Sequence, residues 1–546
     1  MGLARGVAVS RAETRLRFEK HQAGPAEPQV LPTTFVVFMV AAIYSLVMAN
    51  RSQWFFVWYG LAIGAALIIP FLSAKWEGGW LFAALFFGAV CFQNLFLGAS
   101  LGLTNAFKKD PILFMVEIKT VLLFAGWGVF LLDVLRRRIS LKRERTEFGG
   151  IPGMAFALLI AGSFLLSPGS LFARTAYVRN FLSPVAGWYL GRLAVQKKHN
   201  FDRIVGIMLS VGVLLSIVSL VELINPRVWI DYLQLDLLIA YKGPTAEYTD
   251  FLGYVVRRLF TGVGTPINAS FIFSLLFLLA LFMRRYWLAG LFGLQAFLTF
   301  AKAGMLVAFV GTLLFIFRHQ VEKGRSWKRA ALISVPAFLL LTAAYFRFVG
   351  ATTGQMTATD WQGIYSNTVV GHVEGLVGGL RSVLRAPFGE GLGTSGNMNE
   401  VGANIDYSTA DYGDRYIGGA ESSVGVILFQ LGLVGLILLF AWYFRRMQEL
   451  FLAFRQFMHT YPVYAGLALA GLGACLGDIL AQLFSEAALV PQAAGIVFMF
   501  GGMVCSLAIQ MAKETQVVAR RGVETSYSLL PPRFGFRLAK GSPVRH

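Results

Sequence analysis

Two residues of this chain could exchange a proton with a substrate, and each stands close to an apolar segment. His372, in the stretch SNTVVGHVEGL, can gain or lose a proton near neutral pH. Glu421 opens the apolar run ESSVGVILFQLGLVGLILLF, where its carboxylate could act as a general base. Each also has an ordinary alternative: His372 as a surface residue, and Glu421 as an acid that complements the positive end of a helix dipole.

Five basic residues could bind a phosphate or diphosphate, whose oxygens accept charge-assisted hydrogen bonds from guanidinium and ammonium groups. Arg257 and Arg258 precede TGVGTPINAS, and Lys302 lies in LTFAKAGML, where two short apolar runs meet. Arg179 is expected in another turn between apolar runs, and Arg381 stands just before APFGEGLG. The alternative for each is a solvated or lipid-facing charge at the end of a helix.

The segment PFGEGLGTSG, residues 387–396, is rich enough in glycine to raise the question of a phosphate-binding loop. It lacks the Lys-Ser/Thr ending of a P-loop and the strand–loop–helix context of a dinucleotide fold, so we do not expect it to bind a nucleotide. Because they have no side chain, Gly391 and Gly393 would let the backbone turn tightly and approach a ligand. A plain turn-rich loop is the alternative.

The composition places these residues in a membrane protein. Of the 546 residues, 56% are hydrophobic and 14% charged, whereas a soluble protein carries roughly a quarter charged residues. Apolar runs of about 20 residues, long enough to cross a hydrocarbon core of about 30 Å, recur along the chain. We therefore predict an all-α polytopic membrane protein with about 14 (12–14) transmembrane helices and a large, partly helical periplasmic loop. All three cysteines fall inside apolar runs, which disfavours disulfides.

The expected spans have ends that are uncertain by several residues. They are 35–50, 54–74, 79–98, 111–134, 151–167, 176–194, 203–224, 266–283, 286–301, 303–317, 329–346, 421–443, 463–485 and 490–511. A re-entrant hairpin is the alternative for the short pair around Lys302 and for the pair around Arg174.

Basic residues orient these spans, because Lys and Arg close to a span resist translocation. With the basic tail 1–34 in the cytoplasm, the runs RRRISLKRER and RHQVEKGRSWKR and the basic tail 512–546 fall on the same side. Most of the 48 basic residues then lie inside, so the net charge of +19 implies the lipid bilayer as partner and no nucleic acid. Two long loops, about 225–265 and 347–420, face outward.

Three ionisable residues fall inside predicted spans, namely Glu117, Lys119 and Asp478. A charge there is costly unless it is paired or faces a cavity. Glu117 and Lys119 are two positions apart and share no helix face, so we expect each to have a partner on another helix. Such groups also suit proton-coupled transport, which keeps a flippase of lipid-linked sugars as an alternative. Against it, the two halves of the chain show no repeat.

Four segments predicted near the outer face resemble, in this order, the O-antigen ligase and polysaccharide polymerase family of bacterial envelope proteins. They are RRLFTGVGTPINASF, FLTFAKAGMLVAFVGTLLF, LRSVLRAPFGEGLGT and AESSVGVILFQLGLVGLIL. The family's Ser-Arg hairpin is Ala301-Lys302 here, which keeps the cation without the bidentate fork. The ligases' His at the start of the late helix corresponds to Glu421, and the family's Arg before the glycine segment falls near His372.

The resemblance implies a glycosyltransferase of the bacterial inner membrane that acts on the periplasmic face, with an undecaprenyl-diphosphate-linked glycan as donor. Arg258 and Lys302, with Arg257, Arg179 and Arg381 as further candidates, would neutralise the departing diphosphate. The base would be Glu421 or His372, and Gly391 and Gly393 would approach the glycan. No cofactor or metal is expected, because the donor linkage is already activated.

The missing His at 421 favours a polymerase of exopolysaccharide, capsule or O-antigen over a ligase to lipid A core. Under that reading a chain-length regulator or another polysaccharide-export protein is a possible partner.

Overall fold

A computed structural model of the chain describes residues 79–93, 119–124, 126–128, 150–169, 171–225, 248–251, 254–259, 263, 265–322, 336, 340, 371–396, 422–458 and 460–528. The tail 1–34 and the predicted spans 35–50 and 54–74 lie outside the described residues, as does nearly all of 329–346.

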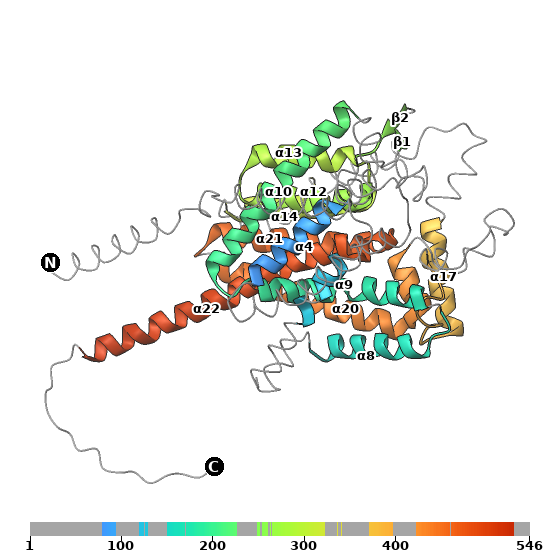
Figure 1. Ribbon diagram of the computed structural model, residues 1–546. Helices are drawn as coiled ribbons and strands as arrows, with labels where there is room; N and C mark the ends of the chain where they lie inside the picture. The colour runs from blue at the N-terminus through green and yellow to red at the C-terminus, as the bar shows by residue number, and fades with distance from the viewer. Residues whose placement is uncertain are drawn as a thin grey trace, which may run out of the picture.

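Helices make up nearly all of the described chain (Figure 1). They are α4 (Gly79–Cys91), α8 (Gly150–Leu166), α9 (Leu171–Ala194), α10 (Lys198–Ile224), α12 (Pro266–Phe282), α13 (Tyr286–Leu298), α14 (Lys302–Glu322), α17 (Gly371–Arg385), α20 (Ser423–Phe457), α21 (Pro462–Ala481) and α22 (Ile496–Ser528), with a 3-10 turn η5 (Glu486–Leu489) and a π-helical turn η6 (Pro491–Gly495). Within the described residues the exception is a β-hairpin of two antiparallel strands, β1 (Tyr248–Phe251) and β2 (Tyr254–Arg257).

Five helical segments are long and apolar enough to cross a membrane. They are Lys198–Ile224, Lys302–Gln320, Ser423–Phe457, Pro462–Ala481 and Pro491–Ala512. Shorter apolar helices are Gly79–Cys91, Pro152–Leu166, Pro266–Phe282 and Tyr286–Leu298. A membrane protein rich in helices is therefore supported, whereas the number of about 14 spans stays a prediction. α13 has 13 residues and is about 20 Å long, shorter than a hydrocarbon core.

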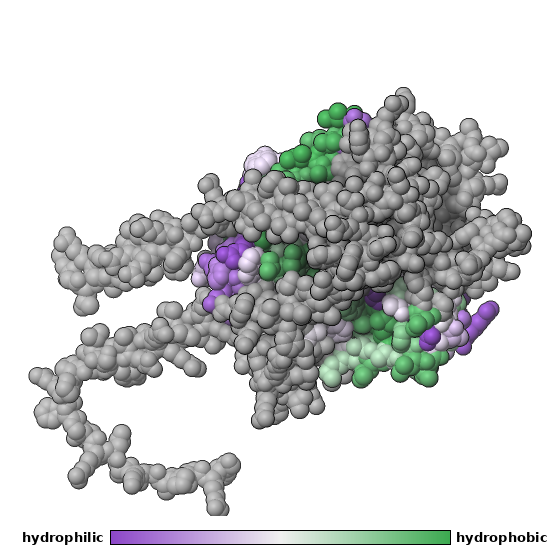
Figure 2. Space-filling model, in the orientation of Figure 1, coloured by the Kyte–Doolittle hydropathy of each residue, from purple (hydrophilic) through white to green (hydrophobic). Residues whose placement is uncertain are grey.

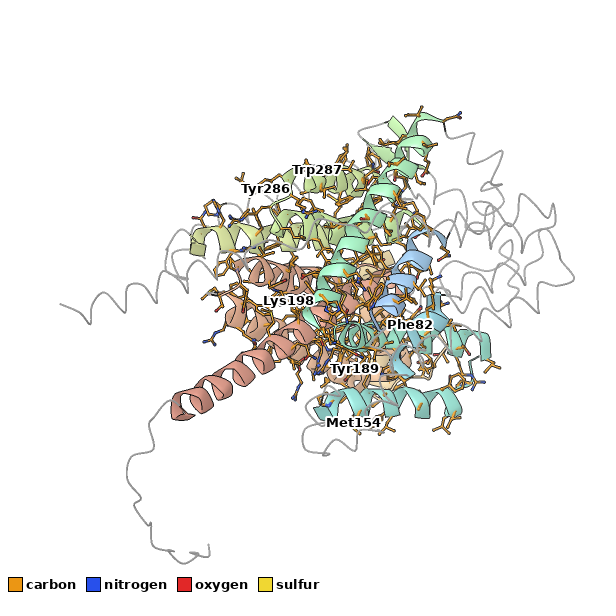
Figure 3. The ribbon with its side chains drawn as sticks, turned by 60° about the vertical axis from the view of Figure 1, so that its left-hand side comes forward. Phe82, Met154, Tyr189, Lys198, Tyr286 and Trp287 are labelled. Atoms are coloured by element: carbon orange, nitrogen blue, oxygen red, sulfur yellow. The ribbon has the colours of Figure 1, made fainter. Side chains whose placement is uncertain are left out.

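The bundle exposes large apolar side chains on its flanks, as expected of a surface that meets lipid (Figure 2). Tyr286 and Trp287, at the start of α13, are 59% and 71% exposed and follow two arginines, a combination typical of a membrane–water interface. Figure 3 shows both rings on α13 and Met154 on the outward side of α8. The interior contains the fully buried Phe82 and, 1% exposed, Tyr189.

Glycines allow the helices of the interior to approach closely. A Cβ added to Gly187 would lie 2.2 Å from the Gly495 carbonyl oxygen, and one added to Gly191 would lie 1.9 Å from that of Met499. Small residues one turn apart are a common way to join helices in membranes, where packing replaces the hydrophobic effect. α9 thus packs tightly along η6 and α22.

Glycines also allow α14 and α21 to pack closely, and the positions of their contacts show that the two helices are antiparallel. Gly477 lies against Val307, near the beginning of α14, whereas Gly466 lies against Arg318, near its end. Just after α21, the Gln482 carbonyl accepts a hydrogen bond of 3.2 Å from the Val424 amide at the beginning of α20. α14 and α20 therefore begin at the same end of the bundle, which we call the site end.

Two of the charged residues predicted inside spans are hydrogen-bonded in the core. Lys119 Nζ donates to Gln93 Oε1 at 2.7 Å, which confirms the expectation of a partner outside its own helix. Asp478 Oδ2 accepts from Gln482 Nε2 at 2.9 Å, and the same amide donates to the Tyr443 hydroxyl of α20 at 2.9 Å. Glu117 lies outside the described residues.

Candidate functional site

Arg258 is held at the site end by the C-terminus of α13. Its Nε donates a hydrogen bond of 3.1 Å to the Thr299 carbonyl, and the next amide, of Leu259, donates to the Leu298 carbonyl at 3.1 Å. The segment after β2 therefore donates hydrogen bonds to carbonyl groups at the end of α13 that have no partner within the helix. A cation at that position also complements the negative end of the helix dipole.

Lys302 lies three residues after Thr299 and is the first residue of α14. The turn between α13 and α14 is tight because Phe300 adopts a left-handed φ of 49°, and the Ala301 amide donates to Thr299 Oγ1 at 3.3 Å. Arg258, bonded to the Thr299 carbonyl, and Lys302 therefore lie at the same turn. The structure thus brings together two cations that the sequence places 44 positions apart.

The beginning of α12 completes this cluster. Thr265 caps the helix by accepting a hydrogen bond of 3.2 Å from the Asn268 amide, and Pro266 occupies the first turn, where no amide hydrogen is needed. A Cβ on Gly304, in the first turn of α14, would collide with Ser270 of α12, so the two helices begin side by side. Their N-termini add partial positive charge to that of Arg258 and Lys302.

The electrostatics of this cluster favour an anion. Burial lowers the pKa of the Arg258 guanidinium to about 10, which leaves it charged at neutral pH. Within the described chain its terminal nitrogens donate no hydrogen bond, although a guanidinium has five N–H groups. The Asn268 Oδ1 atom is buried and also has no partner among the described residues. The Arg258 guanidinium, with its terminal N–H groups, and the neighbouring positive charge of Lys302 suit phosphoryl oxygens, and Asn268 Oδ1 could accept from a hydroxyl.

The beginning of α20 is anchored at the same end. Ser422 caps the helix through a hydrogen bond of 3.1 Å from the Gly425 amide to Ser422 Oγ, and Ser423 Oγ donates to the Ser485 carbonyl at 2.7 Å. Glu421 itself lies outside the described part of the chain. His372 is the second residue of α17, and its side chain is likewise outside the description.

The glycine segment contacts the chain's own backbone. Gly391 (φ 103°) donates its amide to the Gln430 carbonyl of α20 at 3.1 Å, and the Gly393 (φ 75°) amide donates to Gln430 Oε1 at 3.1 Å. Both glycines adopt the positive φ that a tight turn requires, as predicted. The close approach is made to α20, so the expected contact with a glycan stays a prediction.

The reason for this contact is a break in α20. Gly432 has φ 66° and ψ −169°, a conformation that interrupts the helix and leaves backbone groups without intrahelical partners. The loop restores them: the Glu390 amide donates to the Phe429 carbonyl at 2.8 Å, and the Leu433 amide donates to the Pro387 carbonyl at 3.1 Å. The span predicted over 421–443 overlaps the apolar helical segment Ser423–Phe457, and the kink at Gly432 is a feature that the sequence did not predict.

The remaining basic candidates stand on other elements, namely α9, α17 and β2. Arg179 lies two turns inside α9 and not in the predicted turn, and its Nε donates to Asn180 Oδ1 at 3.1 Å. Arg174 stands at that turn and donates to the Phe164 carbonyl at 2.8 Å. Arg381 is exposed on α17, and Arg257 ends β2 with a side chain outside the described atoms.

Three residues of this region were not predicted as functional. Thr299 supplies the carbonyl that orients Arg258, Gln430 bridges Gly393 and Ser395, and Gly432 breaks α20. The only signal in the sequence is that Gln430 and Gly432 interrupt an apolar run. Because an uninterrupted membrane helix can also contain a glutamine or a glycine, this signal does not predict the break. No protein-family model matches the chain, and no curated protein matches it.

Proposed function

We propose that the chain is a glycosyltransferase of the bacterial inner membrane that extends a glycan carried on undecaprenyl diphosphate, with the site end facing the periplasm. The observation that carries this proposal is that Arg258 and Lys302 lie at the same turn, where α13 ends and α14 begins beside the beginning of α12. Two cations and two helix N-termini at the edge of the bundle form a cradle for a lipid-linked diphosphate. Membership of the O-antigen ligase and polysaccharide polymerase family is part of the same proposal.

The reaction follows from what this cradle would stabilise. A hydroxyl of the acceptor sugar attacks the anomeric carbon of the donor, and the bond from that carbon to the diphosphate oxygen breaks. The hydroxyl proton passes to a base, and undecaprenyl diphosphate leaves with the bonding electron pair. Arg258 and Lys302 stabilise the negative charge that develops on the leaving oxygens, which is the largest single contribution in many enzymes.

Two groups are proposed as the base, Glu421 and His372. Ser422, which directly follows Glu421, caps α20 at the site end. α17, in which His372 is the second residue, packs on the beginning of α20 through the close contact of Gly375 and Gly425. Both segments therefore approach the end of the bundle that holds the cation pair, which supports a role for either residue.

The proposal is tested with purified protein and a synthetic lipid-linked repeat unit in vesicles. We expect a ladder of longer glycans on undecaprenyl diphosphate, as a polymerase would make. A product formed only when lipid A core is added would instead favour the alternative, an O-antigen ligase. Translocation of the lipid-linked sugar without either product would favour the other alternative, a flippase, and would overturn the enzyme proposal.

Separate replacement of the two candidate bases should show which of them removes the proton. Glu421→Gln and His372→Ala each keep a polar or small side chain, so we expect normal insertion in both. Loss of the base is expected to slow chain extension by about 10²–10⁴-fold in one variant and little in the other. The measurement is the initial rate of ladder formation at equal protein level. Full activity in both variants would show that neither residue is the base.

A further inference from the structure

Helix α17 has three distinct faces. One is buried on α20, where a Cβ added to Gly379 would lie 2.6 Å from the Gly425 carbonyl oxygen. A second is apolar and open, with Leu380 and Leu384 one turn apart and 53% and 87% exposed. A third carries Arg381 and Arg385, again one turn apart and both exposed. Residues one turn apart share a face, so the leucines and the arginines form two neighbouring stripes.

The apolar stripe continues beyond the helix. Phe388, in the turn after α17, is 71% exposed and lies four residues after Leu384. Ser167, which follows α8, donates from its hydroxyl to the Leu392 carbonyl at 2.5 Å, so the end of α8 meets the glycine segment. α8 adds its own exposed side chains Met154, Leu158, Leu165 and Leu166. Figure 2 shows this hydrophobic surface at the lower right, with hydrophilic residues at its edge.

We propose that α17 lies in the membrane–water interface at the site end, with its leucine stripe among lipid chains and Arg381 and Arg385 on the phosphates of lipid headgroups. An amphipathic helix with an apolar stripe beside a basic stripe is suited to this position. Figure 1 shows α17 lying across the right-hand end of the bundle, the orientation that an interfacial helix requires.

Lipid is the occupant that fits both stripes at once. Water would leave the apolar side chains of Leu384 and Phe388 hydrated, which is unfavourable. Bilayer phosphates supply negative charge at the depth where acyl chains begin, which matches the placement of the two arginines beside the leucines. Under this proposal Arg381 binds lipid phosphates, and only Arg258 and Lys302 are proposed to bind the departing diphosphate. The inference does not depend on the proposed function.

The test measures the depth of α17 by fluorescence, without any glycan. The native cysteines Cys91, Cys475 and Cys505 are buried, so an NBD label can be directed to Leu384→Cys in the full-length protein in vesicles that contain anionic phospholipid. The control label is on His199→Cys, exposed in the first turn of α10. We expect nitroxide-bearing lipids to quench the label at 384, and aqueous iodide to quench the label at 199 several-fold more strongly than that at 384.

The arginines are tested on the same labelled protein. Replacing both with glutamate, Arg381→Glu with Arg385→Glu, is expected to raise iodide quenching at 384 by at least about twofold, because the phosphates then repel the helix. Replacing both with lysine should leave it unchanged, which separates charge from folding. Equal iodide quenching at 384 and 199 overturns the interfacial placement. Quenching at 384 by neither reagent shows that protein covers the stripe, and an unchanged value in the glutamate variant overturns the role of phosphate.

Discussion

Lys302→Ala is expected to slow glycan extension by at least about a hundredfold, and Arg258→Ala by a similar factor. Each removes one of the two cations at the turn where α13 ends and α14 begins. The loss falls on the transition state, where charge develops on the diphosphate, so kcat is expected to fall more than KM rises. The measurement is the rate of ladder formation at several donor concentrations.

A matched control exists at the turn between α12 and α13, at the other end of α13. Arg285 occupies the N-cap position of α13 at the opposite end of the bundle and makes no side-chain capping bond, so Arg285→Ala removes a cation at a helix end without touching the pair. We expect it to retain near-normal activity. Lys302→Arg should retain part of the activity, because the charge remains. A normal rate of ladder formation in both alanine variants, at equal protein level, would contradict the diphosphate cradle and with it the proposed function.

Gly432→Ala is expected to destabilise the protein by about 3 kcal/mol or more. At φ 66° and ψ −169° an alanine is strained, and its Cβ would lie 2.1 Å from the Pro387 carbonyl oxygen and 2.5 Å from the Gly389 amide nitrogen. To make room, the glycine segment would have to leave α20 and give up the hydrogen bonds to Phe429 and Gln430. The expected result is a lower melting temperature of the detergent-solubilised protein and a lower yield of monodisperse protein.

Gly162 provides the control, because it lies inside α8 and a Cβ there meets nothing within 4 Å. Gly162→Ala should leave the melting temperature unchanged or slightly raised, since alanine has the higher helix propensity. If Gly432→Ala were as stable as Gly162→Ala, α20 would be a continuous helix in solution and the account of the glycine segment would be wrong.

Part of the site followed from residue types alone. Arg258 and Lys302 were selected as cations near apolar segments, and the structure brings them together because the chain after β2 returns to the C-terminus of α13. The turn residues 299–301 are compatible with many loop geometries, so neither the left-handed Phe300 nor the role of the Thr299 carbonyl was predictable. Arg179 was expected in a turn and lies within α9, because helix ends are the least certain feature of a hydropathy pattern.

The sequence by itself determined that the chain is helical, apolar and suited to a membrane, because backbone groups in lipid must pair within their own segment and the apolar runs are long enough to allow it. Only the tertiary structure decided that α12, α14 and α20 begin at one end, that Gly432 interrupts α20, and that the glycine segment repairs the interruption. These features depend on contacts between positions that are far apart in the chain. A hydropathy pattern predicts whether a residue prefers water or an apolar environment. It does not predict which distant backbone groups that residue contacts.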